Sequence, residues 1–176
     1  MPTSLSRLSR GQIYLNAEIG AKAEFELKDI APVIEEILLS GGEFRFFPRG
    51  RSMLPLIRQG VDSVLLVPMD DAVNRFDILL YKRDNGMYVM HRIYKISDDG
   101  TYVMCGDNQT VYENGIRKEQ LIGKVRAVYR KNKELRMDSV SQKFYMLLWR
   151  TKFVRGCCLF VYRAFRKIGS LFRVSK

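Results

Sequence analysis

Residues 77–96 read DILLYKRDNGMYVMHRIYKI, and this stretch decides the fold. Its first part is rich in Ile, Leu and Tyr, an Asp-Asn-Gly turn follows, and an apolar pattern then resumes at Met87. Two such runs joined by a turn of this kind are a strong signal of a β-hairpin. The stretch therefore predicts two antiparallel strands, one over residues 77–81 and one over residues 87–96.

Short apolar runs separated by turns continue on both sides of the hairpin. They predict further strands at residues 44–46, 63–67, 101–104 and 121–129. No helical pattern lies between these runs, and several short strands joined by tight turns are typical of an antiparallel β-domain. We therefore expect a mainly β protein whose compact domain spans residues 42–130.

The two ends of the chain have a different pattern. Residues 1–41 begin with a polar, weakly patterned arm, and a short amphipathic helix follows over residues 27–40 and ends at Gly41-Gly42. Residues 131–176 have a helical pattern. When residues 152–173 are wound at 100° per residue, Lys and Arg lie on one face and apolar residues on the other, with Leu159 the one misfit. We therefore expect a basic amphipathic helical tail.

The charge of the chain is concentrated in this tail. The chain carries 30 Lys and Arg against 19 Asp and Glu, and no acidic residue follows Lys143. A basic amphipathic helix binds the surface of an acidic membrane, where each Lys or Arg adds about 1 kcal/mol. The alternative is that its apolar face packs on the β-domain and its charges are solvated. The β-domain lacks basic residues interleaved with stacking aromatics, so nucleic acid is not the expected partner.

Cysteine and histidine usage limits the chemistry. Three cysteines, of which Cys157 and Cys158 are adjacent, give no disulfide framework and indicate reduced thiols. One histidine and no Cys-x-x-Cys pair predict no metal and no cofactor. Residues 1–10 lack the apolar core of a secretory signal, and no run of about 18 apolar residues occurs. We therefore expect a cytoplasmic protein with peripheral contact at a membrane surface.

The sequence Gly50-Arg51-Ser52-Met53-Leu54-Pro55 is a candidate nucleophile turn. Gly50 allows backbone to approach a ligand closely, and Pro55 restricts Leu54 to extended geometry. Such a turn can present the Ser52 hydroxyl outward while nearby N–H groups, including that of Met53, face the place where an oxyanion forms. The alternative is an ordinary surface serine.

His91, the single histidine of the chain, is the candidate general base. It alternates with Val89 and Ile93 on one strand face, where restricted rotamers suit a base. Gly106-Asp107-Asn108 follows the next strand, and Asp107 is the candidate supporting acid, acting directly on the imidazole or by bracing the site through Arg92. Alternatively, His91 is a half-buried packing residue and Asp107 only makes an Asx turn.

In this order, these motifs resemble the signal-peptidase superfamily, in the version that uses histidine rather than lysine as the base. Ser52-Met53-Leu54-Pro55 resembles the nucleophile box, Asp77-Ile78 the box that opens the next strand, His91-Arg92-Ile93 the base box, Gly106-Asp107-Asn108 the last box, and residues 121–125 the closing strand. The resemblance covers residues 42–129. It implies a β-fold serine endopeptidase that cuts signal or leader peptides near a membrane. It also implies that the peptide binds as an added β-strand and has small side chains before the scissile bond.

The same resemblance implies site residues, and the chain departs from the pattern in places. It implies Ser52 as nucleophile, His91 as base and Asp107 as supporting acid. Phe76 stands where the family has glycine before the aspartate of the second box. We expect no N-terminal membrane anchor of the kind usual in the family. Gly50 also lacks the side-chain hydroxyl that lysine-type enzymes often have two residues before the nucleophile.

Two other hypotheses remain open. In a self-cleaving-repressor-like peptidase, Lys82 or Lys95 would replace His91 as the base for Ser52. In the other hypothesis, the protein is a catalytically inactive basic module that binds peptide or membrane.

Overall fold

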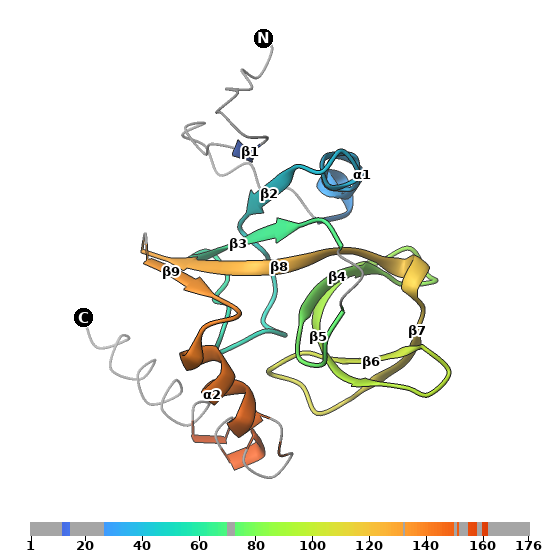
Figure 1. Cartoon of the computed structure of the whole chain (residues 1–176). Coiled ribbons are helices and arrows are strands. Elements are labelled where there is room, and N and C mark those ends of the chain that lie inside the picture. Colours follow the sequence, from blue (N-terminus) through green and yellow to red (C-terminus); the bar gives the residue numbers. More distant parts are fainter. Residues whose placement is uncertain are drawn as a thin grey trace, which may run out of the picture.

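The computed structural model describes residues 12–14, 27–69, 73–131, 133–149, 151, 155–157 and 160–161. One mixed sheet dominates it, and the strand order is β1-β2-β3-β8-β4-β5-β6-β7, with β9 also pairing with β8 (Figure 1). The elements are β1 Gln12–Tyr14, α1 Leu27–Leu39, β2 Glu43–Phe46, β3 Asp62–Val67, β4 Ile78–Lys82, β5 Tyr88–Ile96, β6 Tyr102–Cys105, β7 Glu113–Ile116, a 3-10 turn Lys118–Gln120, β8 Leu121–Arg130, β9 Lys133–Arg136 and α2 Val140–Trp149.

This architecture confirms the predicted mainly β fold and the short N-terminal helix. The hairpin of residues 77–96 forms as β4 and β5, with Leu79 opposite His91 and Tyr81 opposite Val89. All pairs of the sheet are antiparallel except that of β1 with β2.

Three strands correct the sequence analysis. β1 lies within the expected loose arm, β9 lies where a helical pattern was expected, and β7 was not predicted. Each is only three or four residues long, and β7 contains Asn114-Gly115, which has low strand propensity. They form because an existing strand edge offers its backbone groups as a template. The predicted basic helix of residues 152–173 lies largely outside the described residues.

β8 connects the two halves of the sheet. Residues 124–130 of β8 pair with β3, while residues 121–124 pair with β4, so the strand passes from one half to the other (Figure 1). Helix α1 crosses it at Gly123, where a β-carbon would lie 2.5 Å from a methyl group of Leu38. Only glycine allows the helix to approach this closely.

The alternating faces of β4 and β5 feed two separate hydrophobic cores. Ile78, Leu80 and Met90 pack into a core under α1, and this core also contains Met53, Leu56 and Ile57 from the segment after β2. Leu79, Tyr81 and Ile93 point the other way, into a second core with β6 and β7. Because both faces of β4 are buried, its sequence reads as a continuous apolar run rather than an alternating one.

Candidate functional site

Ser52 lies in a series of turns between β2 and β3, over residues 51–61. Gly50 precedes it with φ of 101°, a conformation that a side chain disfavours, so the backbone itself requires glycine here. Met53 and Leu54 are buried, and the peptide bond from Leu54 to Pro55 is cis. The apolar residues after Ser52 therefore anchor the turn in the core and leave Ser52 half-buried at the surface.

A buried carboxylate holds the end of this turn. Asp62, which has no exposed surface, accepts hydrogen bonds from both Arg58 and Arg130, and Arg130 also donates to the carbonyl of Leu56. Burial alone would raise the pKa of Asp62, but the hydrogen bonds from the two guanidinium groups outweigh it and hold the pKa well below its ordinary value. The nucleophile turn is thus fixed to β3 and β8.

Ser52 lines a hollow of about 180 Å³. Its walls come from residues 46–50, 52–53 and 88–90, with Ile57 and with Leu27 and Ile30 of α1. Gly50 and Met53 lie in the same walls as Ser52. The walls are mainly apolar, with Arg49 and Ser52 as polar exceptions, so the hollow suits an apolar side chain next to the Ser52 hydroxyl.

His91 lies on the face of β5 opposite Met90, and the hollow that it lines is not the one that Ser52 lines. The side chain is only 3% exposed and lines a second hollow of about 470 Å³, together with Arg83, Met104 and residues 108–113. Burial lowers the pKa of His91 to about 4, opposed by the negative charge of Glu113. The imidazole is therefore neutral near pH 7, which is the state a general base needs.

The Arg92 side chain, which follows His91, forms a buried ion pair with Asp107. Arg92 Nε and Nη2 each donate to one Asp107 oxygen at 2.8 Å, and the two side chains are 7% and 2% exposed. Tyr145 of α2 also donates to Asp107, at 3.1 Å, and Arg92 Nη1 donates to the Phe76 carbonyl. Of the two roles open to Asp107, the observed one is thus bracing through Arg92. The hydrogen bond found on the imidazole goes to Tyr81 instead.

The turn that contains Asp107 is bonded directly to the Ser52 turn. The Asn108 N–H donates to the Ser52 carbonyl at 2.7 Å, and Asn108 Nδ2 donates to the Arg51 carbonyl at 3.0 Å. A β-carbon on Gly106 would lie 2.7 Å from the Ser52 carbonyl oxygen, so glycine is needed for this approach. Asn108 also lines the hollow of His91, and it therefore links the surroundings of both residues.

The structure connects most of the predicted site residues, but among the described residues it shows no direct hydrogen bond between Ser52 and His91. No hydrogen bond among the described residues joins the Ser52 hydroxyl to His91, and the two side chains line different hollows. Hydrogen bonds of free enzymes are often looser than those of the substrate complex. Asp77 is paired with Lys124 at 2.9 Å and accepts a hydrogen bond from the N–H of Asn74. It therefore shapes the entry to β4 rather than lining either hollow.

Phe76 shows how the departure from glycine is accommodated. Its φ is 76°, the left-handed conformation that glycine adopts freely and that costs another residue about 1–2 kcal/mol. Arg92 donates to the Phe76 carbonyl, and the Arg75 guanidinium lies 4.6 Å from the centre of its ring. These two contacts hold Phe76 in the left-handed conformation.

Three polar residues around His91 were missed by the sequence analysis. Tyr81 Oη lies 3.2 Å from His91 Nδ1 and donates to Glu113 at 2.8 Å, and Arg83 donates to both Glu113 oxygens. The alternation along β4 could have placed Tyr81 on the His91 face. Glu113 gave no such signal because β7 was not recognised.

Comparisons with protein-family models, curated proteins and solved structures gave no match. Within the described part of the chain, no group of three or more His, Cys, Asp or Glu side chains could hold a metal ion. The geometry of the site is therefore the basis for any functional conclusion.

The buried neutral state of His91 predicts a pH-dependent stability. The unfolded chain binds the proton near pH 6.5 and the folded chain only near pH 4, so stability is complete above pH 6.5 and is lost as the pH falls toward 4. Between about pH 7.5 and pH 5, this group should cost the folded state about 2 kcal/mol. Urea unfolding at both values measures the loss, which His91→Gln should abolish.

Asp62 does not interfere in this window, because it stays ionised above its unfolded pKa near 3.8 in both states. An equal pH dependence in the parent and in His91→Gln would contradict the assignment.

Proposed function

We propose that the protein is a serine endopeptidase of the signal-peptidase type. Ser52 attacks the scissile carbonyl, and His91 accepts the hydroxyl proton and later gives it to the leaving amine. The observation that carries the proposal is the bonding of the Asn108 turn to Ser52 on one side and of the same turn, through Asp107 and Arg92, to the His91 strand on the other. Three of the five segments that resemble the family's boxes are thus joined by direct contacts.

The backbone around Ser52 supports the same reaction. Among the described residues, the N–H groups of Ser52 and Met53 donate no hydrogen bond. Two such donors on a turn can bind the oxyanion of a tetrahedral intermediate, a contribution often worth about 3 kcal/mol. The apolar hollow beside Ser52 would take a small apolar side chain that precedes the scissile bond, as in signal and leader peptides.

The lysine-based alternative has less support. Lys82 and Lys95 are both exposed and neither lines the hollow of Ser52 or that of His91. A bulge between Ile93 and Lys95 also breaks the alternation that was expected to place Lys95 on the His91 face. The positions of Lys82 and Lys95 therefore give neither of them support as the base for Ser52.

Cleavage of a synthetic peptide tests the proposal. The peptide should have a basic start, an apolar core and an Ala-x-Ala sequence before the expected cut. Ser52→Ala and His91→Ala should each lower kcat/KM by about 10³-fold or more, because each removes a reacting group. Ser97→Ala and Lys95→Ala serve as controls and should cleave at the parental rate. Loss of cleavage in Lys95→Ala with retention in His91→Ala would favour the lysine mechanism.

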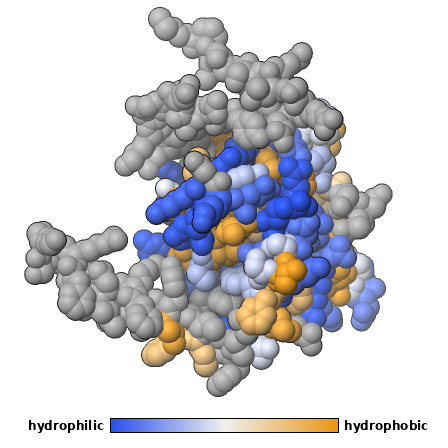
Figure 2. Space-filling view, turned by 60° about the vertical axis from the view of Figure 1, so that its left-hand side comes forward, coloured by the Kyte–Doolittle hydropathy of each residue, from blue (hydrophilic) through white to orange (hydrophobic). Residues whose placement is uncertain are grey.

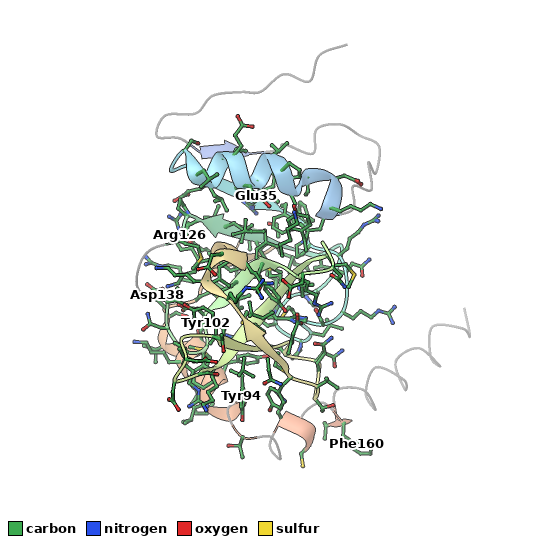
Figure 3. The ribbon with its side chains drawn as sticks, turned by 90° about the vertical axis from the view of Figure 1, so that its right-hand side faces the viewer. Glu35, Tyr94, Tyr102, Arg126, Asp138 and Phe160 are labelled. Atoms are coloured by element: carbon green, nitrogen blue, oxygen red, sulfur yellow. The ribbon has the colours of Figure 1, made fainter. Side chains whose placement is uncertain are left out.

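We further propose that the enzyme works at an acidic membrane surface. Val140, Phe144 and Leu147 lie at helical spacing on one face of α2, and all three are exposed, Phe144 by 62% and Leu147 by 60%. Gln142 and Tyr145 are at least half-buried on the opposite face, so α2 presents its apolar face outward. Phe160 is also exposed and lies at the end of the molecule opposite α1 (Figure 3). In Figure 2, hydrophobic residues gather along the lower edge, below a mainly hydrophilic face.

The charge of the sequence supports lipid as the occupant of this surface. The chain from Lys143 onward contains nine Lys and Arg and no acidic residue. Exposed apolar side chains in a chain with so basic a C-terminal sequence suit the interface of an anionic bilayer. No described helix is long and apolar enough to cross a membrane.

Vesicle sedimentation tests the membrane contact. The full chain should bind phosphatidylglycerol-containing vesicles and bind phosphatidylcholine vesicles much less, with added salt weakening the binding. The double variant Phe144→Glu and Leu147→Glu should bind at least about tenfold less, because two carboxylates replace inserted apolar groups. Leu39→Glu changes an even more exposed apolar residue on α1 (89%) and should bind normally. Vesicle binding unchanged in the double variant, or dimerisation through α2 without vesicle binding, would contradict the proposal.

A further inference from the structure

The polar residues that face His91 form a series of hydrogen bonds across three strands, from Arg83 through Glu113 and Tyr81 to His91, which we call the relay. Arg83, just after β4, donates to both carboxylate oxygens of Glu113 on β7, at 2.7 and 2.6 Å. Glu113 accepts the hydroxyl hydrogen of Tyr81 on β4 at 2.8 Å, and the same Tyr81 oxygen lies 3.2 Å from His91 Nδ1 on β5. Tyr81 has no exposed surface, so these two contacts hold its hydroxyl away from water.

The number of hydrogens along the relay determines which ring nitrogen of His91 carries the hydrogen. A tyrosine hydroxyl has one hydrogen, and an ionised carboxylate can only accept. Burial alone would raise the pKa of Glu113, but the hydrogen bonds from Arg83 and Tyr81 outweigh it and lower the pKa, so Glu113 is ionised. The Tyr81 hydrogen is therefore directed to Glu113, and the Tyr81 oxygen can only accept from His91. The hydrogen on the neutral ring must then be on Nδ1, and the lone pair on Nε2.

We propose that Glu113 and Tyr81 act as positioning residues that hold His91 in the Nδ1–H tautomer and leave Nε2 as the proton acceptor. The assignment of the tautomer stands on its own, while its consequence for catalysis rests on the proposed peptidase function. Asp107 does not take this role, because its carboxylate is bound to Arg92 and Tyr145.

The surroundings of His91 also act on the positive charge that its ring carries during the reaction. When Ser52 attacks, its hydroxyl proton passes to Nε2 and the ring becomes an imidazolium. Nδ1–H continues to donate to Tyr81, which keeps its own hydrogen on Glu113, so no proton moves along the relay. The charged groups near the ring are Glu113 and Asp107, which favour the imidazolium, and Arg83, which opposes it. When the proton leaves for the departing amine, the ring returns to the same tautomer.

Nitrogen-15 NMR of the imidazole tests the assignment directly. His91 is the single histidine, so its two ring nitrogens are identified without assignment work once any affinity tag is removed. At pH 7 the parent should show a protonated Nδ1 and an unprotonated Nε2. Glu113→Ala frees the Tyr81 hydrogen to donate to Nδ1, so the tautomer should reverse to Nε2–H. Tyr81→Phe removes the acceptor of Nδ1–H and should abolish the strong preference.

Tyr102→Phe is the matched control, because Tyr102 is a buried tyrosine of the same core and lies on β6 (Figure 3). It should leave the tautomer unchanged, and the amide spectra show whether each variant is folded. The proposal would be overturned if His91 were the Nε2–H tautomer in the parent, or if folded Glu113→Ala kept the tautomer of the parent.

Cleavage assays add the catalytic consequence. Tyr81→Phe should lower kcat by roughly 10- to 100-fold with little change in KM, because ring orientation rather than substrate binding is lost. The double variant Tyr81→Phe and Glu113→Ala should be no slower than the slower single variant, since the two residues act in series. Full activity in Tyr81→Phe would overturn the positioning role. A parent that cleaves no peptide would overturn the proposed function and leave the tautomer result standing.

Discussion

Arg92 and Asp107 form a bidentate ion pair with almost no exposed surface, and this contact determines how the site is assembled. One end belongs to β5, the strand of His91, and the other to the turn whose Asn108 bonds the Ser52 turn. Removing one partner of such a buried pair typically costs about 3–5 kcal/mol, because the other charge is left uncompensated. The buried ion pair therefore fixes the position of the turn that follows β6.

The pair also connects the surroundings of the two hollows, because Arg92 belongs to β5 and Asp107 to the turn whose Asn108 bonds the Ser52 turn. Met90 faces the core and hollow beside Ser52, whereas His91 faces the second core and its own hollow. The turn of residues 106–108 passes between them, since Asn108 bonds the Ser52 turn and lines the hollow of His91. Asp62 performs a related task at the far end of the Ser52 turn, where Arg58 and Arg130 bind it.

The hairpin and the main strands were predictable because their signals are local. The Asp-Asn-Gly turn set the register of β4 and β5, and alternation along β5 separated Met90 from His91. β7 and β9 were not predicted, because Asn114-Gly115 gives β7 a low strand propensity and β9 lies where the sequence has a helical pattern. The role of Asp107 could be narrowed to two choices from sequence but not decided, since its partner depends on which face of β5 the turn reaches. Glu113 was missed for the same reason, because its function depends on a strand that tertiary contacts create.

The proposed mechanism requires that Ser52 is an activated nucleophile and that His91 activates it. The most direct measurement is the rate at which a fluorophosphonate probe labels the protein, with mass spectrometry to locate the modified residue. The account predicts a single label on Ser52 in the parent and labelling at least about 100-fold slower in His91→Ala. An unlabelled parent, or the same labelling rate in both proteins, would contradict it.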